Sequence, residues 1–488
     1  MLLSRPTRIN LNPLRQPHPS ADPTKPPPQK TSTSLAYNNQ ADILKYMALR
    51  ILLVNPPIYD FAAYGFWLKP YGMLSVAGFL RGNAEFQLFD YIDRLHPFVI
   101  EQKNLHTDKW GRGELYNQQI PSPDCLSQIP RHFRRFGLPQ KIFTGFLEKQ
   151  QPFDYAFIQT MMTYWYPGVK EVIEDIHRIQ PEAKIVLGGN YVTLCSNHAR
   201  QLGADFLVCG NNLEPLWEYL RLAPDLNQPP LWEAYDKLNV GVLKLTDGCP
   251  FSCTYCSVPA VYGRFKPRPL QHSLAEIEFL TKHNVENIAF YDDALLFDAE
   301  NVLVPFLKEI LNRDIKANFH TPNALNARFI TKQLAELMIQ AGFKTFYLGF
   351  ESNSAKWQQA TGSKVFSDEL AGAVEHLVAA GAESQNITAY QILGHPHIGI
   401  QQLEDSMRFV SSLGIRGMLA DFSPLPGTPD GEYCRKWADL DEPLFHNKTA
   451  FPIIMLGFDE SNRLKDLQRQ LNRNLPTGGG LAFRQKLK

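Results

Sequence analysis

Short runs of apolar, β-branched residues alternate along most of this chain with longer stretches in which apolar residues recur every three or four positions. The first run covers residues 50–54 and is stopped by Asn55-Pro56-Pro57. Such uninterrupted runs are typical of strands buried on both faces, and the helical period indicates helices between them. Further strands of this region are expected at 86–90, 155–159, 184–189 and 205–210. Strands that alternate with helices predict a doubly wound parallel sheet over residues 47–225, with ligands bound beyond the carboxyl ends of its strands.

The alternation resumes after the proline-rich segment 226–230. The strands expected there are 241–246, 287–291, 317–321, 345–350, 386–393 and 417–422. Three of the helices between them are expected to be capped at their carboxyl ends by Gly342, Gly381 and Gly414. Six βα units in succession predict a partial, open barrel over residues 235–430, with its active site at the carboxyl ends of its strands. The expected fold class is therefore α/β, a Rossmann-like doubly wound sheet followed by a partial (β/α)6 barrel.

Three segments fall outside this pattern. Residues 1–46 are rich in Pro, Ser and Thr and poor in acids, which predicts a disordered tail. Because Met47 directly precedes the first strand, an over-long gene start is favoured over a transit peptide. Residues 94–150 are expected to form an insertion, in which the Arg/His cluster 131–135 is interpreted as a solvated helix face, with a site for an anionic substrate or a clamp between the two domains as the alternatives. Residues 431–488 are expected to form a C-terminal helical extension that covers the mouth or the open edge of the barrel.

Composition narrows the class of protein without naming a partner. The 488 residues are 44% hydrophobic and 20% charged, as in ordinary globular proteins of two or three domains. A formal net charge of zero gives no general electrostatic footprint for nucleic acid. No apolar run is long enough to predict a membrane span. Seven cysteines, three of them in one loop, indicate a reducing compartment, so a cytoplasmic location is expected.

The candidate chemistry is concentrated in Cys249, Cys253 and Cys256, spaced C-x3-C-x2-C after the expected strand 241–246. Thiolates packed this tightly favour a metal centre, and three ligands suit a [4Fe-4S] cluster with one iron left open. A structural zinc site needs a fourth ligand, and the nearest candidate, His272, is distant in sequence. A zinc knuckle or unligated thiols are the alternative.

Together with the aromatic Tyr255 before its last cysteine, this motif resembles that of the radical S-adenosylmethionine (SAM) superfamily. The resemblance implies that SAM chelates the open iron and that an electron from the cluster cleaves it to a 5'-deoxyadenosyl radical. It also implies that Tyr255 is a cofactor-binding position. A small-molecule substrate and a reductase, flavodoxin or ferredoxin as electron donor are the expected partners.

The same resemblance suggests cofactor contacts at the ends of the barrel strands. Asp292, or its neighbour Asp293, would face the SAM amino group, and Glu351 would bind the ribose hydroxyls. Asn323 would pair with the methionine carboxylate or the ribose. Turn or capping roles are the alternative for each of these residues. His395 is either an acid or base near the substrate or, more often for a lone loop histidine, structural.

The first domain resembles the cobalamin-binding-like domain that precedes the barrel in one branch of the superfamily. The matching segments are 69–74, 162–169 and 188–191. The D-x-H-x-x-G signature, which supplies a histidine below the cobalt, is absent. The resemblance therefore implies cobalamin without a protein imidazole, with Met161, Met162 or Thr163 below the ring and with Gly188 and Gly189 admitting the nucleotide tail. A Rossmann-like domain without corrinoid is the alternative.

These expectations define an enzyme that cleaves SAM reductively, with cobalamin-dependent methyl transfer as the favoured reaction. The first alternative is a radical SAM enzyme without corrinoid, in which hydrogen abstraction leads to rearrangement, ring formation or sulfur transfer. The second is an iron-sulfur or zinc binding module that is not an enzyme.

Overall fold

The computed structural model describes residues 49–102 and 104–475. The predicted disordered tail and the last part of the predicted C-terminal extension lie outside the described residues. Across those two ranges, no helix combines the length and the apolar character needed to cross a membrane.

The first sheet is parallel and five-stranded, in the order β3-β1-β6-β7-β8. Its strands are β1 (Leu49–Asn55), β3 (Ala84–Asp90), β6 (Tyr155–Thr160), β7 (Lys184–Gly189) and β8 (Phe206–Val208). Counted along the chain this order is 2-1-3-4-5, so the chain builds first on one side of β1 and then on the other. The predicted doubly wound sheet is confirmed, and its switch point lies between β1 and β6.

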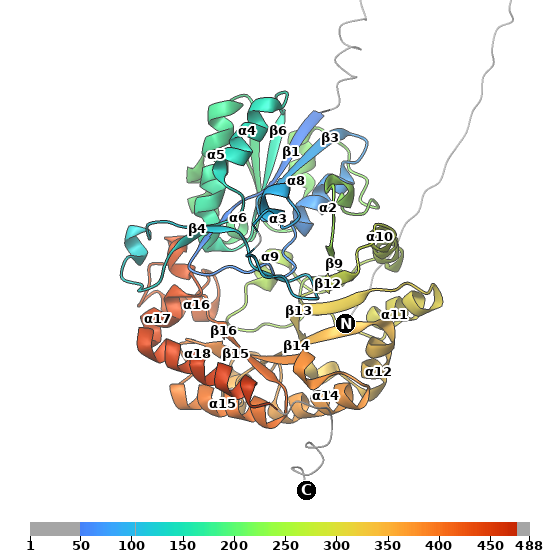
Figure 1. The fold of residues 1–488 in the computed structure, drawn as a ribbon, viewed down its shortest axis with the longest axis vertical. Helices are drawn as coiled ribbons and strands as arrows, with labels where there is room; N and C mark the ends of the chain where they lie inside the picture. Colours follow the sequence, from blue (N-terminus) through green and yellow to red (C-terminus); the bar gives the residue numbers. More distant parts are fainter. Residues whose placement is uncertain (1–48, 103, 476–488) are drawn as a thin grey trace, which may run out of the picture. The chain divides into compact units, whose positions relative to one another are not determined.

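The apolar run of β1 contributes to two cores because alternate side chains of a strand point to opposite faces. Ile51 and Leu53 belong to one core, whereas Leu52 and Val54 belong to the other. The helices at the first core are α2 (Tyr71–Phe79) and α8 (Glu214–Leu220), and those at the second are α4 (Gln140–Lys149) and α5 (Tyr166–Ile179). Helices thus cover both faces of this sheet (Figure 1).

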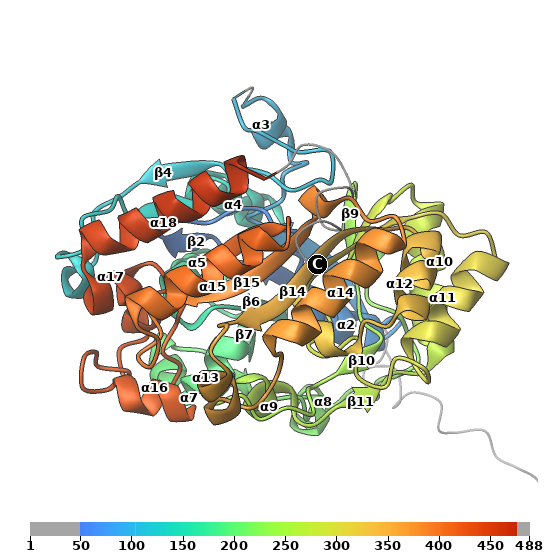
Figure 2. The same ribbon diagram turned by 90° about the horizontal axis from the view of Figure 1, so that it is seen from below.

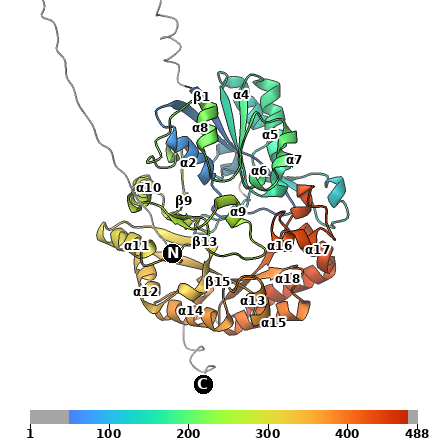
Figure 3. The same cartoon turned by 180° about the vertical axis from the view of Figure 1, so that it is seen from behind.

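The second sheet is a parallel, six-stranded open barrel in the order β9-β12-β13-β14-β15-β16. Its strands are β9 (Val240–Leu243), β12 (Asn287–Phe290), β13 (Asn318–Asn326), β14 (Phe343–Glu351), β15 (Ile387–Leu393) and β16 (Arg416–Asp421). Its outer helices are α10 (Leu270–Lys282), α11 (Leu303–Asn312), α12 (Lys332–Ala341), α14 (Ser367–Ala379) and α15 (Ile400–Ser412), which follow the sheet in Figures 2 and 3. Gly342, Gly381 and Gly414 follow three of these helices with positive φ, as the C-cap prediction requires.

Two barrel strands differ from their expected lengths. β9 stops at Leu243, and Thr246–Asp247 instead form the short strand β10, which pairs with β11 (Lys266–Pro267) in a hairpin. β13 continues five residues beyond its expected end at residue 321, through an irregularity in its pairing with β14 between Thr321 and Leu325. Pro322 and the loss of the alternation between buried and exposed positions at this point gave no indication in the sequence that the strand continues.

The open edge of the barrel is covered by α18 (Phe458–Arg473). The Asn472 side chain accepts a hydrogen bond from the Gly417 amide and donates one to the Gly417 carbonyl, both at 2.9 Å. Lys465 pairs with Asp421 of the same edge strand at 2.8 Å. These contacts satisfy backbone groups that a bare edge strand would expose.

Two strands of the segment expected as an insertion, β4 (Asn117–Gln119) and β5 (Arg134–Phe136), form a small antiparallel sheet with β2 (Ile58–Asp60), which precedes that segment. The interpretation of residues 131–135 as a solvated helix face is therefore wrong. Strand alternation directs Arg135 inward, where it is buried and paired with Glu171 at 2.6 Å.

Side chains from both domains meet around Glu276 of α10. Its carboxylate accepts hydrogen bonds from Tyr71 Oη at 3.0 Å and from Trp232 Nε1 at 2.9 Å. In a second contact, Trp67 stacks on His320 of β13 with ring centroids 4.5 Å apart. The first domain therefore packs directly against the barrel, as one continuous hydrophobic core also indicates.

Candidate functional site

Cys249, Cys253 and Cys256 lie in the loop between β10 and α9 (Val258–Tyr262), and all three are partly exposed. The β10–β11 hairpin closes the base of this loop. Gly248 takes a φ of +69°, and a Cβ there would lie 2.5 Å from the Arg264 carbonyl oxygen. A glycine is therefore required where the loop leaves the hairpin.

A second segment, residues 361–364, packs against the loop that carries the three cysteines. The Thr254 amide donates to the Thr361 carbonyl at 3.3 Å. Gly362 approaches so closely that a Cβ there would lie 3.1 Å from Cys253 Cα. Lys364 follows, with its ammonium 3.1 Å from Glu351 Oε1. The sequence holds one weak signal for this support, the glycine and lysine spaced two apart.

Burial disfavours the thiolate form of the three cysteines. Burial raises the pKa of all three, to about 11 for Cys256, while the positive charge of Lys364 opposes the shift. Metal binding would have to displace these protons, and the nearby lysine would stabilise the resulting thiolates.

Among residues 49–102 and 104–475, no three His, Cys, Asp or Glu side chains converge tightly enough to hold a single metal ion. Ligands of an iron-sulfur cluster bind separate iron atoms and need not converge on one point.

Four successive barrel strands, β12 to β15, carry at or near their carboxyl ends a buried polar atom without a hydrogen-bond partner, and β16 carries a fifth, Asp421 Oδ1, whose other carboxylate oxygen is paired with Lys465. The first four atoms are Asp292 Oδ2, Asn326 Nδ2, Glu351 Oε2 and Gln391 Oε1. Buried polar atoms are rarely left unpaired in native proteins. These atoms are concentrated at one end of the barrel. A polar ligand that offers several hydrogen-bond donors and at least one acceptor would complete their hydrogen bonding there.

Asp292 is fixed by the strand that leads to the cluster loop. Its Oδ1 accepts hydrogen bonds from the Leu245 amide at 2.9 Å and from the amide and hydroxyl of Thr246 at 2.6 and 2.7 Å. Its other oxygen is the free one. The neighbouring Asp293 has its pKa raised to about 6, mainly by burial, with Lys244 opposing the shift.

Glu351 is held in an unusual conformation. Its φ of +63° is left-handed, which costs energy for a residue with a side chain. One oxygen pairs with Lys364, and the other is buried and free. A strained carboxylate with an unused acceptor is typical of a ligand site rather than of a simple turn.

Asn326, and not the predicted Asn323, occupies the carboxyl end of β13. The predicted site residue, Asn323, is exposed on the irregular part of β13, and its amide donates to the Tyr291 carbonyl at 2.9 Å. Asn326 occupies the strand end with a buried, unpaired Nδ2. Sequence reasoning missed Asn326 and Gln391 because it ended β13 too early and gave no reason to select a buried glutamine on β15.

Tyr255 belongs to an aromatic group that includes Trp357 and His395. Its ring stacks on Trp357 at 6.0 Å and meets His395 edge-on at 6.1 Å. His395 is buried and bonded through Nε2 to Asp430 at 3.0 Å. These contacts favour the structural interpretation of His395 over the role of acid or base.

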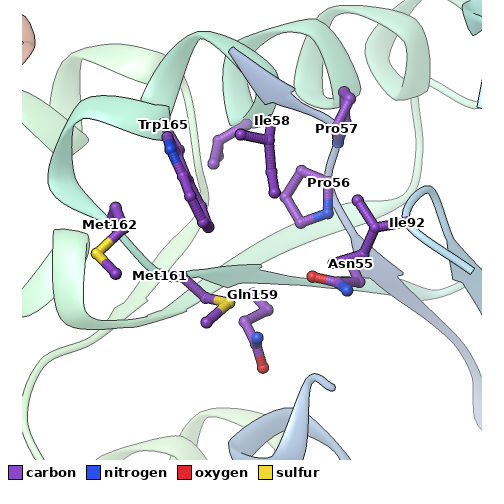
Figure 4. A pocket seen from close by; sticks show the side chains of 10 residues that line it. Asn55, Pro56, Pro57, Ile58, Ile92, Gln159, Met161, Met162 and Trp165 are labelled. Carbon is purple, nitrogen blue, oxygen red and sulfur yellow. The ribbon is translucent and has the colours of Figure 1, made fainter. Parts of the chain in front are cut away.

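At the carboxyl edge of the first sheet, a pocket opens at the switch point between β1 and β6 (Figure 4). Its lining residues are Asn55, Pro56, Pro57, Ile58, Ile92, Gln159, Met161, Met162, Trp165 and Val169. The two methionine sulfurs and the Trp165 ring line one part, and the amides of Asn55 and Gln159 lie at another. None of these ten residues is a histidine.

The other predicted residues of this edge lie around the pocket rather than in it. Thr163 is buried, and its hydroxyl bonds to His446 Nδ1 at 2.9 Å, so Met161 and Met162 take the place expected for it. Gly188 and Gly189 end the neighbouring strand β7. Gly189 has φ +123°, and a Cβ there would lie 2.0 Å from the Thr160 carbonyl oxygen.

Comparison with known proteins gives a family match for residues 243–410, to the radical SAM superfamily. An uncharacterised methyltransferase of Synechocystis sp. is 26% identical over 243 residues, which are 43% of this chain and 44% of that protein. The ribosomal protein uS12 methylthiotransferase RimO of Pelobacter propionicus is 31% identical over 116 residues, 24% of each chain. These matches span less than half the length of the curated relatives.

Among solved structures, the chain resembles the radical SAM methyltransferase TsrM from Kitasatospora setae, solved with cobalamin and a [4Fe-4S] cluster bound. The TM-score is 0.56 with 14% sequence identity, over 80% of this chain and 79% of that chain. The likeness therefore extends over both domains of the fold. Residues 243–410, which carry the three cysteines, therefore form a radical SAM domain, the kind of domain that uses a [4Fe-4S] cluster and SAM.

Proposed function

We propose that this protein is a cobalamin-dependent radical SAM methyltransferase that acts on a small molecule. The observation that carries the proposal is a pocket at the switch point of a Rossmann-like sheet, in a chain whose other domain is a radical SAM barrel. When bound, the cluster would supply the electron that cleaves SAM, and cobalamin would carry the methyl group.

The barrel residues fit SAM in kind and in number. SAM offers an ammonium group, a carboxylate and two ribose hydroxyls, which together can satisfy the free atoms of Asp292, Asn326, Glu351 and Gln391. In this proposal Asp292 accepts from the amino group and Glu351 from the ribose. Tyr255, packed on Trp357, would lie beside the cofactor.

In this proposal one face of a corrinoid lies over the carboxyl edge of the first sheet, against the residues that line the pocket. Apolar side chains can lie against a flat ring, and the amides of Asn55 and Gln159 can bond to the amide side chains at its rim. With no histidine among the lining residues, Met161 or Met162 would lie below the cobalt, and no imidazole would bind it. Gly188 and Gly189 stay the proposed passage for the nucleotide tail.

The neighbouring structure supports this proposal at the level of fold. TsrM holds cobalamin and a [4Fe-4S] cluster, and its two-domain arrangement matches most of this chain. The methyltransferase among the curated relatives agrees in reaction class.

A second candidate is radical chemistry without corrinoid, for which sulfur transfer is the best-supported reaction. The methylthiotransferase RimO shares higher identity with this chain than the methyltransferase does, although over a shorter segment. In that case the first domain would shape the substrate cavity only.

Corrinoid uptake distinguishes the two. The protein is reconstituted anaerobically with iron and sulfide, incubated with hydroxocobalamin and desalted, and the retained corrinoid is measured by its absorption spectrum. We expect stoichiometric retention by the wild type, and loss in Met161→Glu with the cluster content unchanged. Met418→Glu, which alters a partly exposed methionine of the barrel edge, is the matched control.

The electron paramagnetic resonance spectrum of the Co(II) state then reports the lower ligand. Strong nitrogen hyperfine coupling from the protein would contradict the histidine-free site. Failure of the cluster-loaded wild type to retain any cobalamin would favour the corrinoid-free enzyme.

A further inference from the structure

The C-terminal extension returns to the first domain through residues 442–447, which include the short 3-10 helix η7 (Pro443–His446). These residues are called the η7 segment below. They pack against the loop after β6, in which η2 (Thr163–Trp165) leads into α5. That loop forms one wall of the pocket in the first sheet (Figure 4). It contributes the lining residues Met161, Met162 and Trp165.

Asn447 fixes the tryptophan of this pocket wall through a carboxylate. Asn447 Nδ2 donates a hydrogen bond to Asp60 Oδ1 at 2.9 Å, and Trp165 Nε1 donates to Asp60 Oδ2 at 2.9 Å. Asp60 and Asn447 are both fully buried. A buried carboxylate needs donors for both of its oxygens, so each of these bonds supports the other. A residue near the end of the chain therefore helps to set the orientation of the Trp165 ring.

His446 fixes the start of the same wall. Its ring is fully buried, which lowers its pKa to about 4 and keeps it neutral at pH 7. Nε2 lies 3.0 Å from the Leu440 carbonyl oxygen, which can only accept, so Nε2 carries the ring proton and Nδ1 is an acceptor. The Thr163 hydroxyl donates to this Nδ1 at 2.9 Å. The residue that directly follows the two pocket methionines is thus bonded to the η7 segment.

Further contacts anchor the η7 segment on the first domain. Leu444 belongs to one apolar cluster with Phe61, directly after β2, and with Phe133 of the insertion. The hydroxyl of Tyr166, the first residue of α5, donates to Glu442 Oε1 at 3.2 Å. The segment is therefore seated on both sides of the pocket wall, although it belongs to the extension in sequence.

The wall has little support from the first sheet itself. Residues 161–165 lie beyond the last paired residue of β6, so no ladder of the sheet holds them. Across the described part of the chain, the side-chain hydroxyl of Thr163 has one hydrogen-bond partner, His446, and Trp165 Nε1 has one, Asp60. Segments with few contacts of their own open easily. The conformation of this wall therefore depends on the η7 segment.

We propose that His446 and Asn447 are positioning residues for the corrinoid site of the first domain. They hold Thr163 directly and Trp165 through Asp60, so that residues 161–165 present the face on which the corrinoid lies. The inference rests on the proposed function, which supplies the ligand of this pocket. Neither His446 nor Asn447 lines the pocket, so both act through side chains of the first domain. Corrinoid affinity then depends on a segment that follows the barrel in sequence.

The test removes each bond in the full-length, cluster-loaded protein and measures the Kd of hydroxocobalamin by absorption titration. Thr163→Val keeps the shape of the side chain and removes its hydroxyl, whereas Asn447→Ala removes the donor to Asp60. We expect Kd to rise about tenfold or more in each variant. Thr163→Ser restores the hydroxyl and should bind within about threefold of the wild type. Asn447 also accepts from the Ala450 amide at the start of α17 (Ala450–Leu456), so Thr163→Val decides alone if Asn447→Ala does not fold.

Hydrogen exchange gives a second readout that needs no corrinoid. Mass spectrometry of peptides that cover residues 160–166 should show faster exchange in Thr163→Val and Asn447→Ala than in the wild type or in Thr163→Ser. Iron content and SAM cleavage driven by titanium(III) citrate should stay within about twofold of the wild type, because the lost bonds lie in the first domain and not at the barrel mouth.

Asn472→Ala is the matched control from the same extension. It removes the two hydrogen bonds to Gly417 of the barrel edge. It should lower the unfolding free energy, yet leave the Kd of hydroxocobalamin and the exchange of residues 160–166 unchanged.

Three results would overturn the proposal. The first is an unchanged Kd in Thr163→Val and Asn447→Ala beside a wild type that binds hydroxocobalamin, which leaves the proposed function standing. The second is an equal rise of Kd in Asn472→Ala, which would assign the effect to general stability. The third is a wild type that binds no hydroxocobalamin, which would overturn the proposed function and this inference together.

Discussion

Replacement of Glu351 by glutamine tests the ligand site where the structure is most specific. The substitution keeps the shape of the side chain but removes its charge. One carboxylate oxygen pairs with Lys364 at 3.1 Å, and the other is buried and free to accept from the ligand. In the proposed site, Glu351→Gln would weaken a charge-assisted hydrogen bond to SAM, and it would leave Lys364 without its anionic partner.

The two consequences have different magnitudes. Loss of a hydrogen bond to a charged group costs about 1.5 to 3 kcal/mol, which corresponds to roughly a ten- to hundredfold weaker binding of SAM. Removing one partner of a buried ion pair costs about 3 to 5 kcal/mol of folding stability. The stability loss should be at the lower end of that range or below it, because the Lys364 side chain is 20% exposed and the cluster thiolates also lie near its charge.

The assay is SAM binding to anaerobic, cluster-loaded protein by equilibrium dialysis, with urea unfolding of the same samples. Glu309→Gln is the control, because this carboxylate forms a partly exposed ion pair with Arg313 at 3.0 Å and its loss should cost about 1 kcal/mol at most. Unchanged SAM affinity in Glu351→Gln, at full iron content, would refute the assignment of this residue to the cofactor.

Three further substitutions test the fold. Burial raises the pKa of Glu276 to about 7, against hydrogen bonds from Trp232 and Tyr71, so the folded state keeps a proton that the unfolded chain loses above pH 4.5. The unfolding free energy should then fall between about pH 4.5 and 7, by up to about 3 kcal/mol. Glu276→Gln should abolish this pH dependence in urea titrations. A variant whose unfolding free energy depends on pH as the wild type's does would contradict the raised pKa of Glu276. Arg135→Met, which leaves Glu171 buried without its cation, should cost about 3 to 5 kcal/mol by urea unfolding, whereas a cost as small as that of Lys170→Met, in the exposed pair of Lys170 and Glu174, would show that the buried pair contributes little. Gly189→Ala should lower the unfolding free energy by at least about 1 to 3 kcal/mol, because only glycine accepts its φ and ψ, while Gly145→Ala in an open helix position should be neutral or stabilising; equal effects would contradict the clash with Thr160.

The layered architecture could be predicted because it depends on local pattern. In β1, residues 51–54 offer no polar position, so only a strand covered on both faces accommodates them, and the helices of both cores follow from the same rule. The cysteine motif is equally local, since its three residues lie within eight positions of one loop. The glycine C-caps are determined by single residues and were predicted for the same reason.

The contents of the site depend on contacts that the sequence does not display. Lys364 becomes part of the site only because the segment after α13 (Ala355–Ala360) folds back against the cluster loop. Asn326 ends its strand only because β13 continues through an irregularity in its pairing. Arg135 pairs with Glu171, which is distant in the sequence and lies on helix α5. Each is a tertiary effect that overrides the local preference of the segment.

The unpaired atoms at the barrel mouth imply a link between ligand and stability. A buried polar group without a partner costs about 1 to 3 kcal/mol, and four such groups lie at the ends of adjacent strands, beside the strained φ of Glu351. A ligand that satisfies them binds the folded state only, so SAM should raise the unfolding free energy of the cluster-loaded protein, by about 2.7 kcal/mol at a hundredfold excess over its Kd. Urea titrations with and without SAM measure this gain, and Glu351→Gln should show less of it at the same SAM concentration. If SAM binds with normal affinity and yet leaves the unfolding midpoint unchanged, the unfolded chain or an intermediate must bind it equally well, and the free polar atoms would then have to be assigned to another ligand.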